Sequence, residues 1–143
     1  MSKGNTTENS LLLLIFNATT WNDIAQNDGS SPLTDLYVAL HTGDPGEGGA
    51  QNTSECAYGS YARVAVARTG SGWTVSGNSA TNAALIQFPQ CSSGSETITH
   101  VSIGHLSSGA GTVLYKGALS ASLAVSSGIQ PQFAATALTV TED

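Results

Sequence analysis

The stretch LYVALHTGDPGEGG, residues 36–49, joins an alternating apolar run to a segment rich in glycine and proline. The alternation over residues 36–41 predicts a β-strand, because successive side chains of a strand point to opposite faces. Its two faces would be formed by Leu36, Val38 and Leu40 on one side, and by Tyr37, Ala39 and His41 on the other. Pro45 presets its own backbone and Gly46 tolerates a positive φ, so we expect the strand to run into a tight turn.

Three side chains in this stretch, His41, Asp44 and Glu47, are of the types that bind metals and transfer protons. They offer a divalent cation few ligands, however, because calcium loops use a denser series of oxygen atoms. The turn is therefore the favoured interpretation, and we expect no metal or other cofactor. The loop that begins here, residues 42–60, is the least structured part of the sequence and the first place to look for contacts between chains.

Outward from this stretch, short alternating runs separated by Gly, Ser and Asn recur through the rest of the chain. Strands are predicted at residues 36–41, 61–68, 73–76, 82–88, 96–104, 112–119, 122–126 and 136–141. Tight hairpin turns are indicated by RTGSGW, residues 68–73, and SSGAGT, residues 107–112. The pattern predicts a mainly β fold, an antiparallel β-sandwich or a jelly-roll-like barrel of about eight short strands with one N-terminal α-helix.

The length of 143 residues predicts a single domain, with an N-terminal arm and helix (1–32) followed by the sandwich (33–143). Apolar residues at helical spacing predict the helix over about residues 10–26, capped by Asn9 or Ser10. Additional leucines make this helix apolar nearly all round at its start, so it must be buried on more than one side. The favoured interpretation is that it lies across its own sheet, and the alternative is that a partner subunit covers it.

Charge and composition exclude several classes of partner. The chain has four Lys and Arg residues and ten acidic residues, which gives a net charge of −6. It therefore lacks the cationic surface that binds nucleic acids or anionic membranes. The apolar run at residues 11–16 is far shorter than the ~20 residues of a membrane span. We expect it to be mature sequence rather than a signal peptide, because only Lys3 precedes it. Cys56 and Cys91 are expected to be free thiols, with a single bridge as the alternative.

Motifs for catalysis are absent from the sequence. No serine stands in a G-x-S-x-G elbow, and the close glycine pairs lack the third element of a dinucleotide or phosphate loop. His100 and His105 are five residues apart, so on a strand they point to opposite faces and cannot share a metal. The acids are scattered, which argues against a pair of glycosidase carboxylates. We therefore expect no enzymatic activity and no catalytic, cofactor-binding or metal-binding residues.

Several consecutive segments resemble a known family. They are LYVALHTGDPGEGGAQNTSECAYGSYARVAVAR (36–68), GWTVSGNSATNAALIQFP (72–89) and THVSIGHLSSGAGTVLYKGALSASLAVSSGI (99–129). Together they resemble small bacteriophage virion proteins that are commonly labelled tail fibre proteins, over about residues 33–141. The resemblance brings no catalytic motif and implies a structural role in the virion. That role is either decoration of the capsid shell as a cement protein, which is the favoured interpretation, or a place in the tail apparatus as a fibre.

Such a role implies partners among other capsid or tail proteins, and further copies of the chain in a homo-oligomer. The residues expected at these interfaces are Leu11, Leu12, Leu13, Phe16, Trp21, Asp44, Glu47 and Tyr58. The alternative is a receptor-binding or glycan-binding module that uses exposed aromatic side chains such as Tyr58 and Trp73. A small hydrolase or metal enzyme around His41 is the least favoured hypothesis.

Overall fold

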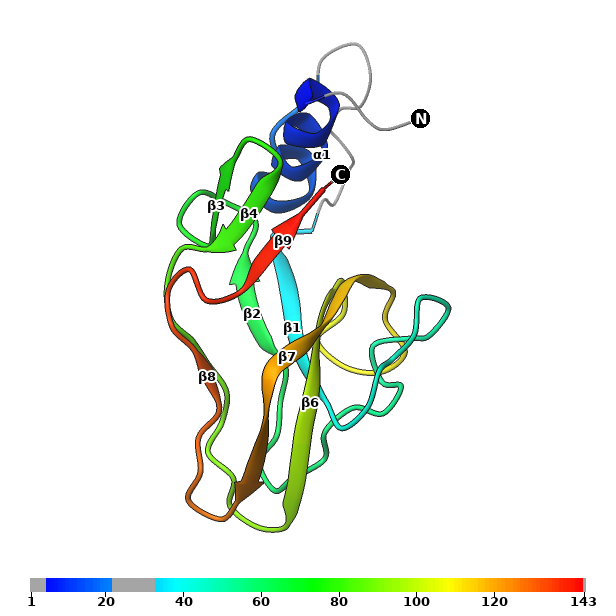
Figure 1. The fold of residues 1–143 in the computed structure, drawn as a ribbon, viewed down its shortest axis with the longest axis vertical. Helices are drawn as coiled ribbons and strands as arrows, with labels where there is room; N and C mark the ends of the chain where they lie inside the picture. The colour runs from blue at the N-terminus through cyan, green and yellow to red at the C-terminus, as the bar shows by residue number, and fades with distance from the viewer. Residues whose placement is uncertain (1–4, 22–32, 143) are drawn as a thin grey trace. The chain divides into compact units, whose positions relative to one another are not determined.

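The computed structural model describes residues 5–21 and 33–142, which form one helix and nine strands (Figure 1). The elements are α1 (Asn5–Asn17), β1 (Asp35–His41), β2 (Val64–Ala67), β3 (Trp73–Ser76), β4 (Ser79–Asn82), β5 (Ile86–Gln87), β6 (Ser95–Gly104), β7 (Val113–Ser126), β8 (Gln132–Phe133) and β9 (Thr139–Thr141). The predicted class is confirmed, because the fold is mainly β, with antiparallel sheets and one N-terminal helix, as in a β-sandwich-like protein. Within these residues, no helix has the length and apolar character of a membrane span.

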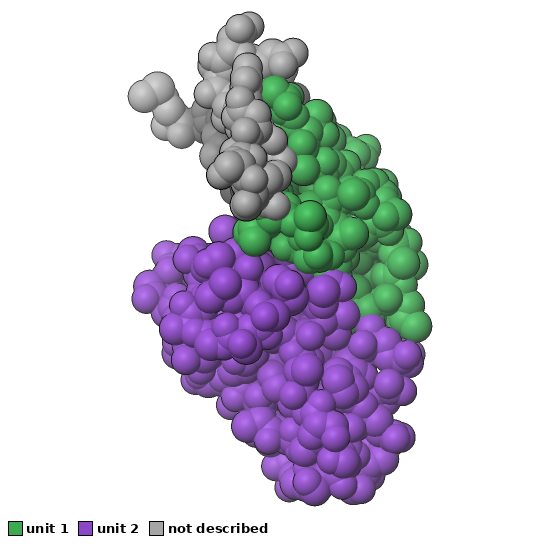
Figure 2. Space-filling model, turned by 180° about the vertical axis from the view of Figure 1, so that it is seen from behind, with its two compact units in different colours: residues 1–35, 66–86, 133–143 green, residues 36–65, 87–132 purple. Residues whose placement is uncertain are grey.

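The chain forms two compact units, which are coloured separately in Figure 2. Unit 1 comprises residues 1–35, 66–86 and 133–143, and unit 2 comprises residues 36–65 and 87–132. The sequence predicts a single domain with an N-terminal arm and helix over residues 1–32 and a sandwich over residues 33–143. Within unit 1, however, α1 contacts β3 and β4, so the helix belongs to a unit that also contains strands. A single domain for the whole chain stays a prediction.

Unit 2 contains most of a four-stranded sheet with the strand order β2-β1-β6-β7. β1 and β6 pair antiparallel, with Val38 opposite Ile103 and Leu40 opposite Val101. These side chains are buried and, together with Leu36, form a wholly apolar face. The period-two alternation of β1 therefore directs its large apolar residues to one side of the sheet, as the sequence predicts.

The opposite face of this sheet is largely buried although its residues are polar or small. They alternate with the apolar residues of the same two strands: Ala39 and His41 on β1, and His100, Ser102 and Gly104 on β6. Residues 42–60, which we name the cover loop, contribute to this burial, because the Gln51 side chain lies against Gly104 and the Thr53 carbonyl is 3.0 Å from the His41 ring. The loop returns beside β1, where the Thr42 amide donates to the Ser54 carbonyl at 2.8 Å. Because both faces are covered, β1 is buried at every position from Val38 to His41.

Three of the predicted strands have nearly the expected bounds, whereas β2 (Val64–Ala67) is shorter than the strand predicted at residues 61–68. The predicted strands at 36–41, 73–76 and 96–104 match β1, β3 and β6 within one residue at each end. The last predicted strand is too long, because it was expected to begin at residue 136 and β9 begins at Thr139. Thr136 has a φ of 66°, which lies in the left-handed region and is incompatible with a strand.

β7 is one strand of 14 residues where the sequence pattern predicts two. The interruption in the pattern is a bulge, because Ile98 pairs with Leu123 whereas His100 pairs with Ala118. Residues 119–122 of β7 therefore lie opposite a single residue of β6. β7 is an edge strand, and a bulge of this size interrupts the row of free backbone groups with which another strand would pair.

The two predicted hairpin turns have different outcomes. Residues 107–112 lie in the connection between β6 and β7, which pair antiparallel, so the hairpin is confirmed, but the connection spans residues 105–112 and is longer than a tight turn. The turn at residues 68–73 is tight, with the Trp73 amide donating to the Thr69 carbonyl at 2.9 Å, but it connects strands of different sheets. The hairpin of unit 1 is β3–β4, where Gly77 has the positive φ, 59°, that a two-residue turn requires.

Unit 1 contains the three-stranded sheet β3-β4-β9. The prediction of a single strand over residues 82–88 is wrong, because β4 ends at Asn82 and a separate short strand, β5, follows. The side-chain amide of Asn82 is buried and donates to the carbonyl oxygens of Ala84 and Ala134 at 2.8 Å. Its oxygen accepts from the Leu138 amide, also at 2.8 Å. These bonds take the chain out of strand geometry after β4.

The helix begins and ends earlier than predicted. α1 spans Asn5–Asn17, whereas the spacing of apolar residues predicts a helix over residues 10–26. Residues 22–26 of that prediction lie outside the described residues. Ala18 follows the helix with a positive φ of 51°, so the helical backbone stops at Asn17 although the apolar spacing continues.

Arg68 holds the C-terminal end of the helix. Its guanidinium donates to the carbonyl oxygens of Leu14 and Ile15, at 2.8 and 2.7 Å, and to that of Leu33 at 2.7 Å. The last carbonyls of a helix have no partner within it and carry partial negative charge, so a cation placed here is favourable. Burial lowers the pKa of Arg68.

The apolar contact between α1 and the β3–β4 hairpin forms the core of unit 1. Leu12, Phe16 and Trp73 are fully buried, and the rings of Phe16 and Trp73 are tilted against each other with centroids 4.7 Å apart. Asn9 adds a polar contact, because its side-chain amide donates to the Gly77 carbonyl at 2.7 Å. The helix therefore lies on its own sheet, which was the favoured interpretation of its apolar sequence.

Candidate functional site

The cover loop is the part of unit 2 where polar side chains gather, and it carries Asp44, Glu47 and Tyr58, which the sequence singles out as interface residues. Residues 42–60 are all described and contain none of the nine strands. The position of the loop on the sheet therefore depends on side-chain anchors, several of which come from outside the loop.

His41 anchors the middle of the cover loop. Its side chain is fully buried, with Nδ1 3.0 Å from the Thr53 carbonyl oxygen and Nε2 2.8 Å from the Ser102 hydroxyl. A carbonyl oxygen can only accept, so Nδ1 carries the proton and Nε2 of the neutral ring accepts from Ser102. Burial lowers the pKa of His41 below its usual 6.5, because the charged ring would lose its hydration.

The contact between Ser102 and His41 pairs a hydroxyl with an imidazole, as in hydrolases, but it is enclosed. Ser102 is 1% exposed and His41 has no exposed surface. A nucleophile and its base must reach a substrate atom, and neither group can do so in this structure. The pair is therefore a structural link between β1, β6 and the loop.

The predicted turn after β1 is present, and Asp44 shapes it. Its carboxylate accepts from the Gly46 amide at 2.8 Å, and Gly46 has a positive φ of 75°. The same carboxylate lies 3.0 Å from the ammonium group of Lys116 on β7. The hydrogen bond from Gly46, and then the one from Lys116, lower the pKa of Asp44.

His41, Asp44 and Glu47 are not brought together as metal ligands. Both ring nitrogens of His41 are engaged, Asp44 faces Lys116, and Glu47 is exposed. In the part of the chain that the structure describes, no group of three or more His, Cys, Asp or Glu side chains is placed to hold a metal ion.

A buried ion pair between Arg63 and Glu55 fixes the second half of the cover loop. Nε of Arg63 lies 2.7 Å from one carboxylate oxygen of Glu55, and Nη2 lies 2.8 Å from the other. The side chains are 1% and 15% exposed, respectively. The remaining guanidinium donors reach the carbonyl oxygens of Leu106 and Gly109, at 2.8 and 2.6 Å. The pair therefore ties the loop to the turn between β6 and β7.

Sequence reasoning missed this pair, although a signal for it exists. Arg63 lies inside the alternating run YARVAVAR, in a chain with only four cationic residues. A buried arginine needs an anion and carbonyl oxygens around it, and Glu55 is an acid close by in the sequence. The carbonyl partners at Leu106 and Gly109 are more than 40 residues away and carry no such signal.

Two tyrosines complete the contacts of the loop. Tyr61 donates to the Glu55 carboxylate and accepts from the Leu40 amide, both at 3.0 Å. Tyr58 donates to the Pro89 carbonyl at 3.0 Å. Their rings meet edge to face, with centroids 5.2 Å apart. Burial raises the pKa of Tyr58 to about 12 and also raises that of Tyr61, so both hydroxyls act as neutral structural donors.

Cys56 and Cys91 are buried free thiols, as predicted. Burial, reinforced by the nearby Glu96 carboxylate, raises the pKa of Cys56 to about 12. Because the thiolate is the reactive form, Cys56 is an inert part of the core at neutral pH.

Gln51 fastens the cover loop to the β6–β7 hairpin. Its side-chain oxygen accepts from the Leu106 amide at 3.1 Å, and its nitrogen donates to the Tyr37 carbonyl at 3.3 Å. The buried amide fits here because Gly104 and Gly111 have no side chains. A Cβ atom on either glycine would overlap with atoms of the Gln51 side chain.

Replacing Gly104 by alanine is therefore expected to destabilise unit 2 by about 1 to 3 kcal/mol, because the added methyl must displace buried Gln51. The matched control is Gly117→Ala on β7, where nothing lies within 4 Å of the added Cβ. We expect this control to be neutral or slightly stabilising. Urea denaturation followed by the near-UV circular dichroism of the tyrosines, all of which belong to unit 2, measures both variants. Equal stability of the two would contradict the described packing of Gln51.

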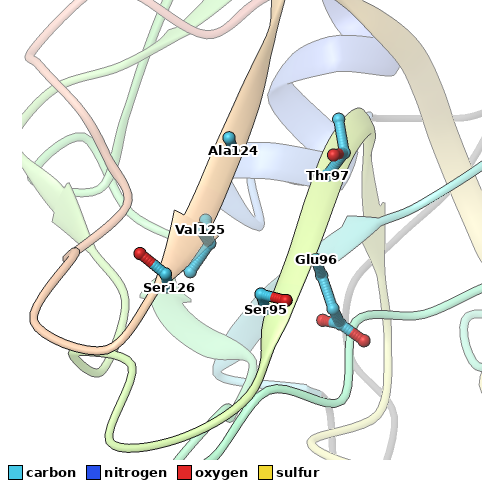
Figure 3. Close-up of a pocket in the computed structure, with 6 residues that line it drawn as sticks. All are labelled: Ser95, Glu96, Thr97, Ala124, Val125 and Ser126. Carbon is cyan, nitrogen blue, oxygen red and sulfur yellow. The ribbon is translucent and has the colours of Figure 1, made fainter.

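An open pocket of about 360 Å³ lies on β6 and β7. It is lined by Ser95, Glu96, Thr97, Ala124, Val125 and Ser126 (Figure 3). Figure 3 shows the Glu96 carboxylate pointing away from the residues of β7. This carboxylate accepts from the amides of Ala57 and Tyr58, at 2.9 and 3.1 Å, and so fastens the end of the cover loop. The other lining side chains are small, apolar or hydroxyl-bearing and carry no charge.

The residues that the sequence predicts at interfaces differ in exposure. Three are buried within their own units: Leu12, Phe16 and Tyr58. Five are partly or fully exposed: Leu11, Leu13, Trp21, Asp44 and Glu47. The buried residues present no surface to a partner in this structure, and the exposed ones stay interface candidates.

The family model described as podophage GP4 fiber I protein gp80 matches residues 3–141, nearly the whole chain. No curated protein matches the chain.

Proposed function

Because the chain belongs to the podophage GP4 fiber I protein family, whose members are components of the bacteriophage virion, we propose that it is a non-enzymatic subunit of a virion fibre. The observation that carries this proposal is the family match over residues 3–141. The match confirms the resemblance to small phage virion proteins that are labelled tail fibre proteins. It also extends the similarity through the N-terminal helix, which the resemblance from sequence did not cover.

A structural role is supported by the way unit 2 uses its polar side chains. His41 and Glu96 bind backbone groups of the cover loop, and Glu55 binds the guanidinium of Arg63. Asp44 holds its own turn and Lys116. These residue types can also perform acid–base chemistry, but here each one fixes a loop to a sheet. A subunit that must keep its shape within an assembly has use for such internal anchors.

The sequence favours decoration of the capsid shell over a tail fibre, whereas the description of the matched family favours a fibre. We therefore propose the fibre. The chain would bind other virion proteins where the fibre is attached, and further copies of itself within the fibre. Leu11 and Leu13 on α1, and Asp44 and Glu47 on the cover loop, are the residues that we propose for these contacts.

Recognition of a glycan receptor by Tyr58 or Trp73 is not part of this proposal. Tyr58 is 3% exposed and Trp73 is fully buried, each within its own unit. A sugar ring stacks on the face of an accessible aromatic side chain, so neither residue can serve as that platform.

Immunogold electron microscopy of intact particles tests the fibre assignment. An antibody raised against the chain is expected to label appendages of the particle, and the same antibody preabsorbed with the purified protein serves as the control. Label spread over the capsid shell would instead support a decoration protein. If mass spectrometry detects no copy of the chain in purified particles, a role in the virion is overturned.

A further inference from the structure

Two histidines face each other across the central strands of the unit 2 sheet. His41 of β1 pairs directly with His100 of β6, and directly opposed residues of an antiparallel pair point to the same face. This is the face beneath the cover loop, and His41 is one of the anchors of that loop. The third histidine, His105, follows β6 and accepts from the Thr112 amide at 2.9 Å, away from this pairing.

We propose that His41 and His100 form an acid-sensitive latch, which holds the cover loop on the sheet at neutral pH and releases it as the pH falls. Histidine is the side chain whose charge ordinarily changes between about pH 5 and 8. The neutral ring of His41 fits its site, because its one N–H donates to Thr53 and its free nitrogen accepts from Ser102. A second proton would place a charge in a fully buried position opposite another histidine.

The charged groups that face His41 come from several elements, and most of them oppose its protonation. Glu55 of the cover loop favours the charged ring, whereas Arg63 and His100 disfavour it. Glu55 is already paired with Arg63 at 2.7 Å, so the two charges largely cancel at His41. Burial, which is the largest influence, and His100 oppose the proton, whereas the hydrogen bond to the Thr53 carbonyl favours it, and the pKa of His41 is lowered on balance.

β7 contributes one further charge to this face. Lys116 lies opposite Ser102, the residue that contacts His41, and its ammonium group is 3.0 Å from the carboxylate of Asp44. This ion pair is partly exposed, and the hydrogen bonds from Gly46 and Lys116 lower the pKa of Asp44. Asp44 also interacts favourably with a positive charge on His100, and that charge in turn disfavours a proton on His41.

The lowered pKa of His41 determines how release of the cover loop depends on pH. Burial lowers the pKa of His41 in the closed state, and release would return it toward 6.5. Below pH 6.5 the released state therefore binds more protons than the closed state, so falling pH favours release. Above that pH the ring is neutral in both states and the latch makes no contribution that depends on pH.

Release would change the surface of unit 2. Ile98 is fully buried and lies on the same face of β6 as His100, and Ala39 of β1 is also buried there. Release would withdraw the Gln51 side chain and the Thr53 carbonyl, which lie against this face at Gly104 and His41. Acid would thus open the polar face around His41, Ser102 and Gly104 to solvent or to a partner. The latch is a property of the folded chain and does not depend on the proposed fibre function.

Hydrogen exchange on the full chain, corrected for intrinsic rates, tests the latch between about pH 8 and about pH 5. The reporters are the amides of Thr42 and Cys56, which donate to the Ser54 and Leu40 carbonyls. Their protection is expected to fall as the pH drops below 6.5. Where the released state binds one more proton than the closed state, the fall is about ten-fold for each pH unit. The β3–β4 hairpin of unit 1, which contains no histidine, should keep its protection. Constant protection of the loop amides, or parallel loss in both units, would overturn the proposal.

Three variants assign the effect to the two histidines. His100→Gln removes a neighbour that disfavours the charged form of His41, so it is expected to reduce the loss of protection between about pH 6.5 and pH 5. His105→Gln is the matched control and should leave the loss of protection unchanged, whereas His41→Gln should remove the pH dependence. If His41→Gln does not fold, the other two variants decide alone. Equal behaviour of His100→Gln and His105→Gln would exclude the latch.

Discussion

Replacing Arg63 by methionine is expected to lower the free energy of unfolding of unit 2 by about 3 to 5 kcal/mol. The substitution keeps an unbranched apolar stem but removes the guanidinium, whose side chain is almost completely buried. The Glu55 carboxylate then stays in the interior with a hydrogen bond from Tyr61 and no cation. The carbonyl oxygens of Leu106 and Gly109 lose their donors as well. The free-energy cost of burying an unpaired charge exceeds the stabilisation that the intact ion pair contributes, so the expected loss of stability is large.

The near-UV circular dichroism of the tyrosines, followed in urea, measures this loss, because all four tyrosines belong to unit 2. The matched control is Lys116→Met, which breaks the more exposed ion pair with Asp44 and should cost no more than about 1 kcal/mol.

A second control removes both charges of the buried pair. Because Glu55 is then no longer left alone, Arg63→Met combined with Glu55→Met should be less destabilised than Arg63→Met by itself. If Arg63→Met and Lys116→Met cost the same, the ion pair is not buried as described.

Replacing Phe16 by alanine is expected to destabilise unit 1 by about 3 to 5 kcal/mol. Phe16 and Trp73 are fully buried and their rings are in contact, so the truncation leaves a cavity between α1 and the β3–β4 hairpin. The fluorescence of tryptophan measures this effect selectively, because both tryptophans of the chain belong to unit 1. The emission should shift to longer wavelength as water reaches Trp73.

The matched control for Phe16→Ala is Leu85→Ala in the same unit. Leu85 is 52% exposed, so its truncation should change the stability by no more than about 0.5 kcal/mol. A loss below about 1 kcal/mol for Phe16→Ala, without a shift in emission, would show that the helix is not packed on the hairpin. The two substitutions Arg63→Met and Phe16→Ala also test whether the units unfold independently, since tyrosine and tryptophan signals report on different units.

Local patterns in the sequence predicted the elements whose geometry is set by near neighbours. β1 and β3 were located within one residue at each end, because their side chains alternate to the end of each strand. The turn after β1 was also predicted, since Pro45 and Gly46 have few backbone conformations to choose from. The structure retains this turn and adds the hydrogen bond from the Gly46 amide to Asp44.

Errors arose where a distant residue ends an element. The helix was predicted to continue through Trp21, but its end at Asn17 is held by Arg68, whose guanidinium reaches carbonyls more than 50 residues away in the sequence. The strand predicted at residues 82–88 is interrupted because the Asn82 amide bonds to Ala134. Apolar periodicity contains no information about such partners.

The sequence by itself determined the mainly β class, the virion family and the Pro-Gly turn, because alternation, turn chemistry and ordered family segments are all local properties. Only the tertiary structure decided that the weakly patterned loop of residues 42–60 covers the second face of a sheet. Its anchors, His41, Gln51 and the Arg63–Glu55 pair, are polar groups that must find hydrogen-bond partners once they are buried. Burial requires that such partners exist, but which of them meet depends on how distant strands are aligned.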